Sequence, residues 1–219
     1  MKKLLTLFIP LLLALAFSSC EELLVQPVNP VNPVQNQPAQ YVGISSERFN
    51  YVASSQQQSQ WCWAASIQMV LNYYGIAIQQ PEIVARTYGT DYFRNLPNWA
   101  GSFEAITANL NYAGLDNYGQ AYQVQSVVYY GAPDAQTLID ELSRQRPVIV
   151  GYQTGPGAGH AVVITAASYI ETSTGSVLQS VVVRDPWPSL QNNQTHGRQE
   201  YATNAFLRAV QAHWYVRVQ

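Results

Sequence analysis

The order of two hydrophobic patterns along the chain limits its fold more than any other feature. Between residues 62 and 144, apolar side chains recur at helical spacing. In the first such run Cys62, Met69 and Val70 share one face, and Gly75 ends the pattern. From residue 147 onward, apolar side chains come instead in short β-branched and aromatic runs. Helices that precede strands, rather than alternate with them, predict an α+β fold with an antiparallel sheet.

These patterns predict the elements individually. The expected helices are 62–74, 81–88, 102–112 and 133–144, and the expected strands are 147–152, 161–165, 179–184 and 213–218. Residues 41–54 are mixed, with room for one short strand.

The N-terminus has the pattern of a bacterial export signal. Two lysines precede an apolar run over 4–17, which is shorter than the ~20 residues that a membrane span requires. Two serines then precede Cys20, and this arrangement resembles a bacterial lipobox. We expect residues 1–19 to be a lipoprotein signal peptide and Cys20 to be the lipid attachment site. The mature protein would then be anchored to a membrane of the cell envelope, at the outer membrane or the cell surface. The alternative is an ordinary secretory signal with an incidental cysteine.

Residues 20–40 have the composition of a linker. Proline recurs at every third position from Pro27 to Pro33, which favours an extended, semi-rigid chain of ~3 Å per residue. We expect residues 41–219 to form a single domain.

Composition excludes several classes of function. Charged residues make up 11% of the chain and the formal net charge is −2, so no basic patch suited to nucleic acid is expected. Two cysteines are too few for a disulfide scaffold or a cysteine-rich zinc site. The histidines show no metal-ligand spacing, and no glycine-rich phosphate loop is present. We therefore expect no metal or cofactor.

Cys62 is the first candidate for chemistry. If Cys20 carries lipid, Cys62 has no disulfide partner, and it begins a predicted helix. The helix dipole and free N–H groups stabilise a thiolate at such a position. A nucleophile and a buried, unreactive thiol both fit these observations.

Three histidines could serve as its base. His160 follows the glycine-rich stretch 155–159 and opens an apolar strand, where glycines allow close approach of a substrate. His196 lies in a polar loop and is expected to be solvated. His213 opens the last strand and is expected to be structural.

Two further groups could complete the site. Asp185 ends the strand 179–184 and could orient a histidine on a neighbouring strand, although Asp-Pro is also a common turn starter. Glutamines at 56, 57, 58 and 60 precede Cys62. A side-chain amide there, together with the Cys62 N–H, could hold an oxyanion.

Together these pieces resemble the papain-like cysteine peptidases. Gln56 lies six residues before Cys62-Trp63-Ala64, His160 starts a core strand, and Asp185-Pro186-Trp187 is similar to the Asn-x-Trp of that superfamily. The short domain, Trp61-Cys62-Trp63-Ala64-Ala65 and the Asp in place of Asn look nearest to the compact bacterial groups similar to AvrRpt2-type and C39-like peptidases.

The resemblance implies a papain-like fold with its helical part packed on the sheet. It implies Cys62 as nucleophile, His160 as general acid–base, Asp185 as orienting residue and Gln56 as oxyanion donor, with the register among Gln56, Gln57 and Gln58 open. Trp63 and Trp187 would pack at the site.

Three functions are compatible with this site. The leading expectation is a cysteine peptidase that acts on a peptide or protein substrate. The same three residues also serve transglutaminases, amidases and deamidases. The third possibility is a catalytically inactive binding lipoprotein on the same fold, with its tyrosines and tryptophans as a contact surface. The sequence leaves the oligomeric state open.

Overall fold

A computed structural model of the protein describes residues 37–91 and 95–219, and all of them belong to one structural unit that runs from Pro33 to Gln219. The predicted signal peptide, Cys20 and the linker as far as residue 36 lie outside the described residues. No helix in the described part of the chain is long and apolar enough to cross a membrane.

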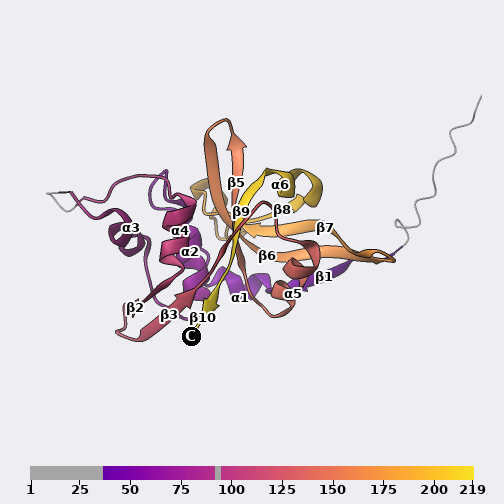
Figure 1. Cartoon of the computed structure of the whole chain (residues 1–219), viewed down its shortest axis with the longest axis horizontal. Coiled ribbons are helices and arrows are strands. Elements are labelled where there is room, and N and C mark those ends of the chain that lie inside the picture. Colours follow the sequence, from indigo (N-terminus) through magenta and orange to yellow (C-terminus); the bar gives the residue numbers. More distant parts are fainter. Residues whose placement is uncertain (1–36, 92–94) are drawn as a thin grey trace, which may run out of the picture. The chain divides into compact units, whose positions relative to one another are not determined.

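Figure 1 labels most of the helices and strands of the unit. The helices are α1 (Ser46–Asn50), α2 (Cys62–Tyr73), α3 (Gln80–Tyr88), α4 (Phe103–Asn109), α5 (Ala135–Ser143), the short 3-10 helix η2 (Pro188–Leu190) and α6 (Thr203–Ala209). The strands are β1 (Gln40–Gly43), β2 (Tyr112–Leu115), β3 (Ala121–Gln125), β4 (Val128–Tyr130), β5 (Val148–Gly155), β6 (Ala158–Thr172), β7 (Gly175–Arg184), β8 (Arg198–Ala202), β9 (Val210–Tyr215) and β10 (Arg217–Val218).

The strands form two antiparallel sheets. The larger sheet has the order β4-β9-β5-β6-β7-β8, with β1 paired to the C-terminal half of β6. The smaller sheet has the order β10-β3-β2. Every pairing between these strands is antiparallel, so the predicted α+β fold with an antiparallel sheet is confirmed.

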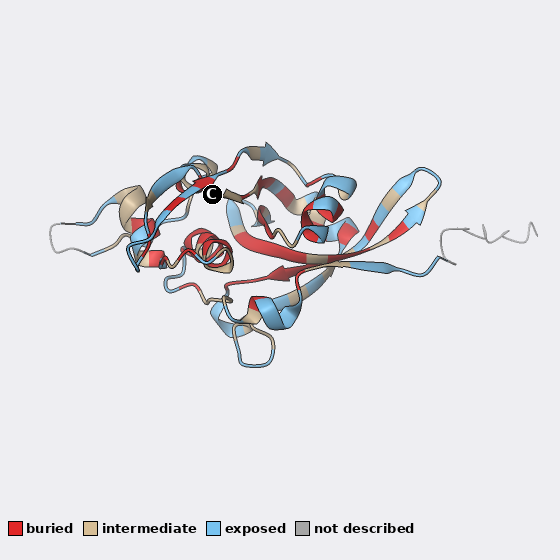
Figure 2. Ribbon diagram, turned by 90° about the horizontal axis from the view of Figure 1, so that it is seen from below, coloured by how far each residue is buried: buried red, intermediate tan, exposed pale blue. Residues whose placement is uncertain are grey.

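The larger sheet buries both of its faces. Along β6, Ala161 and Val163 join the core shared with α2, α3 and α4. Their neighbours Val162 and Ile164 join the core shared with α5 and α6. Side chains of a strand alternate between its two faces, so four consecutive apolar residues serve two cores. In Figure 2 the buried segments run along the middle of the sheet, while the hairpin tips are exposed.

Helix α2 is the central helix of the unit. Most of its side chains are buried, among them Trp63, Ile67 and Leu71, and it packs against β6, α3 and α4. A helix that is apolar on most of its circumference is stable only inside a protein. The position of Cys62 at its N-terminus is therefore fixed by packing on several sides.

Several elements differ from the sequence-based expectation. The helix expected over 102–112 ends at Asn109, and Tyr112 begins a strand instead. The amide of Asn111 exchanges hydrogen bonds with the backbone of Ser126 and so joins the end of α4 to the segment after β3. The strand expected over 213–218 is divided between β9 and β10, which belong to different sheets.

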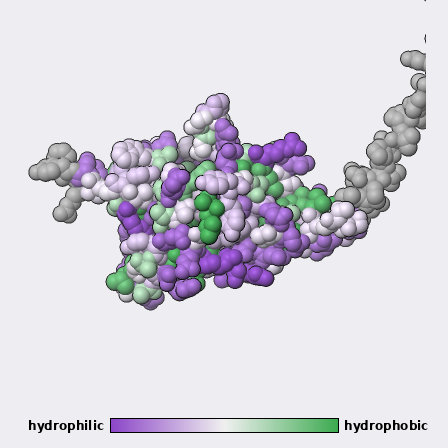
Figure 3. All heavy atoms as spheres, viewed as in Figure 1, coloured by the Kyte–Doolittle hydropathy of each residue, from purple (hydrophilic) through white to green (hydrophobic). Residues whose placement is uncertain are grey.

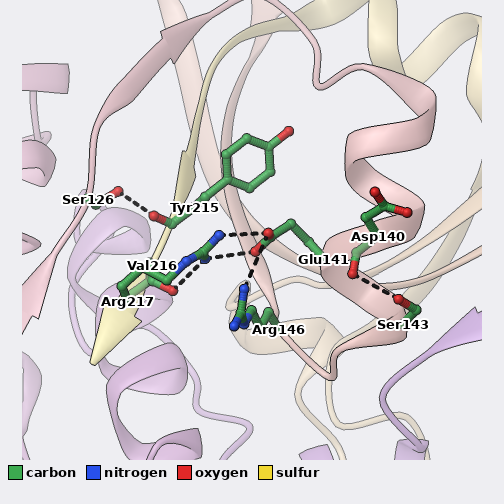
Figure 4. A network of polar contacts seen from close by, with 8 residues as sticks. All are labelled: Ser126, Asp140, Glu141, Ser143, Arg146, Tyr215, Val216 and Arg217. Carbon is green, nitrogen blue, oxygen red and sulfur yellow. Dashed lines mark hydrogen bonds and ion pairs between the residues drawn. The ribbon is translucent and has the colours of Figure 1, made fainter. Parts of the chain in front are cut away.

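A buried carboxylate joins α5 to the C-terminal strand (Figure 4). Glu141 accepts two hydrogen bonds from Arg217, at 2.7 and 2.6 Å, and lies 3.7 Å from Arg146. Fork-to-fork pairing of this kind satisfies a carboxylate that is otherwise costly to bury. The ion pair between Glu141 and Arg217 therefore connects β10 of the smaller sheet to α5, which packs on the face of the larger sheet opposite α2.

The visible surface is hydrophilic although the chain carries few charges. Figure 3 shows mostly hydrophilic residues on this face, with apolar ones in scattered patches. Charged residues form only 11% of the sequence, so amide and hydroxyl side chains supply much of this polarity.

Candidate active site

Cys62 is the first residue of α2 and is partly exposed. The preceding residue, Trp61, makes no side-chain capping bond to the helix. The first N–H groups of α2 therefore have no side-chain acceptor, and they present the positive end of the helix dipole.

His160 lies near the start of β6 and is paired across the sheet with Tyr152. Its Nε2 is 2.8 Å from Oδ1 of Asp185, the first residue after β7. Because β6 and β7 are antiparallel neighbours, the start of β6 and the end of β7 lie side by side. The bond occupies Nε2 and leaves Nδ1 as the ring nitrogen available to Cys62.

The electrostatics of His160 favour its charged form. Burial alone lowers the pKa of the imidazole, but hydrogen bonds to Asp185 and Cys62 and attraction to both charges outweigh burial and raise the pKa to about 9. The structure thus pairs His160 with Asp185 and places Cys62 in the lining of the same cavity as His160. An imidazolium beside a thiolate is the arrangement that activates a cysteine nucleophile.

Two aromatic rings flank the imidazole. The Tyr152 ring lies 5.7 Å from the His160 ring at an angle of 73°, and the Trp187 ring lies 6.3 Å away at 80°. Burial and the nearby charge of Asp185 raise the pKa of Tyr152, which keeps its hydroxyl neutral. Trp187 remains 47% exposed and also donates its backbone N–H to Asp185 Oδ1 at 2.8 Å.

A mainly apolar cavity of about 260 Å³ opens beside the sulfur and the imidazole. Cys62 and His160 line it together, and its walls come from the start of α2, from α4 and from the β5–β6 hairpin. A larger open hollow of about 610 Å³ lies elsewhere, between β3 and β9, and contains none of the candidate catalytic residues. We assign the chemistry to the smaller cavity because it adjoins Cys62.

One wall of this cavity is an extended segment held by indole groups. Trp61 and Trp63 donate their Nε1–H groups to the carbonyls of Pro97 and Trp99, at 3.0 and 3.2 Å. Gly101 lies flat against the Trp63 ring, where a Cβ would meet the ring atoms. Trp63, expected as a packing residue, therefore shapes the segment 97–101 as well as lining the cavity.

Gln56 is buried close to the site, with its amide already engaged. Its Nε2 donates to the carbonyls of Gln58 and Ser59, at 3.0 and 2.9 Å, and its Oε1 has no partner among the described residues. Gln60, in contrast, lines the cavity with Cys62. Nothing in the sequence, apart from its nearness to Cys62, indicates that Gln60 lines the cavity.

The other two histidines lie outside the cavity. His213 is buried in β9, with Nδ1 2.8 Å from the carbonyl of Gly131 and its ring stacked on Tyr129. His196 lies in the loop before β8, with a φ of 47°. Within residues 37–91 and 95–219, no three His, Cys, Asp or Glu side chains are grouped as a metal site.

The helix-borne cysteine, the neighbouring antiparallel strands and their His–Asp pair define a papain-like cysteine peptidase fold. Digestive procathepsin L2 from the larval midgut of Tenebrio molitor has this fold. It is 14% identical, with a TM-score of 0.50 over 80% of this chain and 67% of that one. The chain belongs to the Peptidase C39-like family, whose model matches residues 48–216.

Two other solved structures are similar over most of the chain. One is the peptidase domain of Streptococcus ComA, a bi-functional ABC transporter involved in quorum sensing, at 16% identity and a TM-score of 0.47 over 75% of this chain and 95% of that one. The other is a double glycine motif protease from an AMS/PCAT transporter in complex with the leader peptide, at 16% identity and a TM-score of 0.42 over 84% and 95%. A comparison with curated proteins gives no match.

Proposed function

We propose that this protein is a cysteine peptidase that hydrolyses peptide bonds through Cys62, His160 and Asp185. The 2.8 Å bond between His160 Nε2 and Asp185 Oδ1 is the observation that carries the proposal. It fixes the tautomer and orientation of an imidazole whose other nitrogen is available to Cys62.

The reaction follows from this arrangement. Nδ1 of His160 takes the proton from Cys62 Sγ, and the thiolate attacks the carbonyl carbon of the substrate. The oxyanion is stabilised by the backbone N–H of Cys62 at the start of α2 and by the side-chain amide of Gln56. To reach the oxyanion, Nε2 of Gln56 gives up one of its two hydrogen bonds to backbone carbonyls. His160 then protonates the leaving amine, and water hydrolyses the thioester.

The cavity supports a peptide substrate. Its lining carries more apolar than polar surface, with Trp63, Phe103 and Ile106 contributing, and its volume of about 260 Å³ accommodates a side chain next to the reacting carbonyl. An apolar residue near the cleaved bond fits this cavity best.

Incubation with a peptide library, followed by mass spectrometry, tests the activity. We expect new peptide termini from the wild type and none from Cys62→Ala or His160→Ala. Undiminished cleavage by either variant would contradict the proposal. Loss of side-chain amides or formation of cross-links, without new termini, would assign the site to a deamidase or transglutaminase instead.

We further propose that the enzyme is tethered to the bacterial cell envelope through lipid on Cys20. The apolar run over 4–17 and the two serines before the cysteine support this assignment. Labelling of cells with a fatty acid probe should modify the wild type and leave Cys20→Ala unlabelled. Equal labelling of both proteins would exclude Cys20 as the attachment site.

A further inference from the structure

The main chain of Asp185 is held as firmly as its side chain. Its N–H donates to the carbonyl of Gly197 at 2.8 Å, and its own carbonyl accepts a hydrogen bond of 2.6 Å from Nε2 of Gln191. The loop 187–197 thus leaves Asp185 and returns to bond it on both sides. None of these contacts involves a group that exchanges protons with substrate.

Gly197 is required by the shape of this loop. Its φ is 70°, which disfavours any residue with a Cβ. A Cβ at this position would also collide with the amide of Gln191 and with the carbonyl of Asp185. The N–H of Gly197 closes the loop on the carbonyl of Leu190 at 2.9 Å.

A buried guanidinium fastens the loop to the rest of the unit. Arg184 is 1% exposed and donates to the carbonyls of Thr195 and His196 at 3.3 Å each. It also donates to Asn50 Oδ1 at 2.7 Å and to the carbonyl of Ser46 at 3.2 Å. No carboxylate bonds to it among the described residues, so its partners are the loop and α1 rather than an acid.

We propose that the loop 187–197 is a positioning element for Asp185, in which Gln191 and Gly197 set the direction of the carboxylate and Arg184 holds the loop to α1. This inference rests on the proposed function, because the group to be aligned is the His160–Cys62 pair. If the backbone of Asp185 rotates, its carboxylate moves away from Nε2 of His160 and the short hydrogen bond between them is lost. Catalytic groups must be held within ~0.5 Å of their productive geometry, so a small rotation is enough to disturb the site.

Alkylation of Cys62 by chloroacetamide tests the inference without a known substrate. The ratio of the rates at about pH 5.5 and about pH 8.5 reports how much thiolate is paired with imidazolium under acidic conditions. We expect Gln191→Met, which keeps the length of the side chain but removes its donor, to slow the acidic rate by about 3- to 10-fold and the alkaline rate by less than about 2-fold. Gln194→Ala, an exposed change in the same loop, should leave both rates unchanged.

Gln191→Asn is the second variant if Gln191→Met fails to fold. It keeps an amide but is shorter by one methylene, so the amide nitrogen, now Nδ2, no longer reaches the Asp185 carbonyl, and we expect the same selective loss under acid. A wild-type rate ratio in either folded variant would overturn the positioning role while leaving the proposed function intact. A wild type that reacts slowly under acid would contradict the proposed function itself, and the inference with it.

Discussion

His160 is the residue at which the interactions of the site converge. It is hydrogen-bonded to Asp185, lines the cavity together with Cys62, and is flanked by the rings of Tyr152 and Trp187. Because both polar partners are acidic, their charges stabilise the imidazolium more than burial destabilises it. Under the proposed function, the proton affinity of this one ring sets the charge state of the site when a substrate binds.

The pH dependence of activity should report this affinity. The pKa of His160 is raised from 6.5 to about 9, so the imidazolium needed to protonate the leaving amine persists until the pH rises through about 9. We expect kcat/KM measured on a cleaved peptide to fall on the alkaline side near that pH. Asp185→Asn should move this fall toward lower pH, because the largest favourable partner loses its charge. An alkaline fall at the same pH in both proteins would contradict the assignment.

The oxyanion donor can be identified by comparing two glutamines. We expect Gln56→Ala to lower kcat by about 10²-fold with little change in KM, because an oxyanion contact exists only in the transition state. Gln57→Ala is the matched control, since the backbone of Gln57 rather than its side chain is bonded to Gln80. If Gln60→Ala lowers kcat and Gln56→Ala does not, the donor is the cavity-lining Gln60.

The residues proposed for catalysis could be predicted because each stands at the end of an element. Cys62 begins a helix, His160 lies near the start of a strand and Asp185 directly follows one. Glycine, proline and the hydrophobic period mark these boundaries in the sequence. Their roles stay a prediction. The cavity wall 97–101 could not be foreseen, because its position depends on indole bonds across 36 residues of sequence and on no local motif.

At the scale of elements, α2 does more than carry the cysteine. The indoles of Trp61 and Trp63, at its first turn, hold the segment 97–101 against the cavity. The same turn therefore positions both Cys62, the proposed nucleophile, and a wall of the candidate substrate cavity. Changes in this turn should affect substrate binding separately from chemistry.

Trp61→Phe tests this coupling. The substitution removes one indole donor from the carbonyl of Pro97, at a net cost of about 0.5–1.5 kcal/mol, and so loosens the cavity wall. We expect KM to rise by about 2- to 10-fold while kcat changes by less than about 2-fold. Tyr73→Phe, which removes a donor to the carbonyl of Gln145 from the other end of α2, should leave KM unchanged. Equal effects from both variants would indicate a general loss of stability.

The secondary-structure predictions were right where a hydrophobic pattern of one period continued over enough residues to be recognised. Helix α2 and strands β5 to β7 follow clear patterns, and their existence was predicted. Strands β2, β4 and β10 have four residues or fewer, too few to establish a period. Strand β3 alternates between exposed and buried residues over five positions, a signal that could have been used.

At the scale of the whole unit, two cores lie on opposite faces of the larger sheet. The buried carboxylate of Glu141 links α5, which packs on one of these faces, to the C-terminal strand β10. It receives both donors of Arg217 from the C-terminal strand. Removing Arg217 would leave Glu141 with Arg146 at 3.7 Å as its nearest cation in the described structure.

Arg217→Met should therefore destabilise the folded protein. The side chain of Glu141 is 7% exposed and that of Arg217 is 41% exposed, so solvent screening reduces the loss from that of a fully buried pair to about 1–3 kcal/mol. Urea unfolding of the purified domain would measure it. Arg198→Met, which breaks the exposed pair with Glu200, should cost less than about 1 kcal/mol. Equal costs for the two variants would show that the Glu141 pair contributes no more than a surface contact.

Strand β6 also fixes the separation between the first strand of the described domain and His160, the proposed general acid–base. Gln40, in β1, is paired with Tyr169 near one end of β6, and His160 lies near the other. The nine residue-to-residue steps from His160 to Tyr169 span about 30 Å at ~3.3 Å each. The first strand of the described domain and the candidate cavity therefore lie toward opposite ends of β6, so a tether through Cys20, as we propose, would lead into the domain at the end away from the cavity.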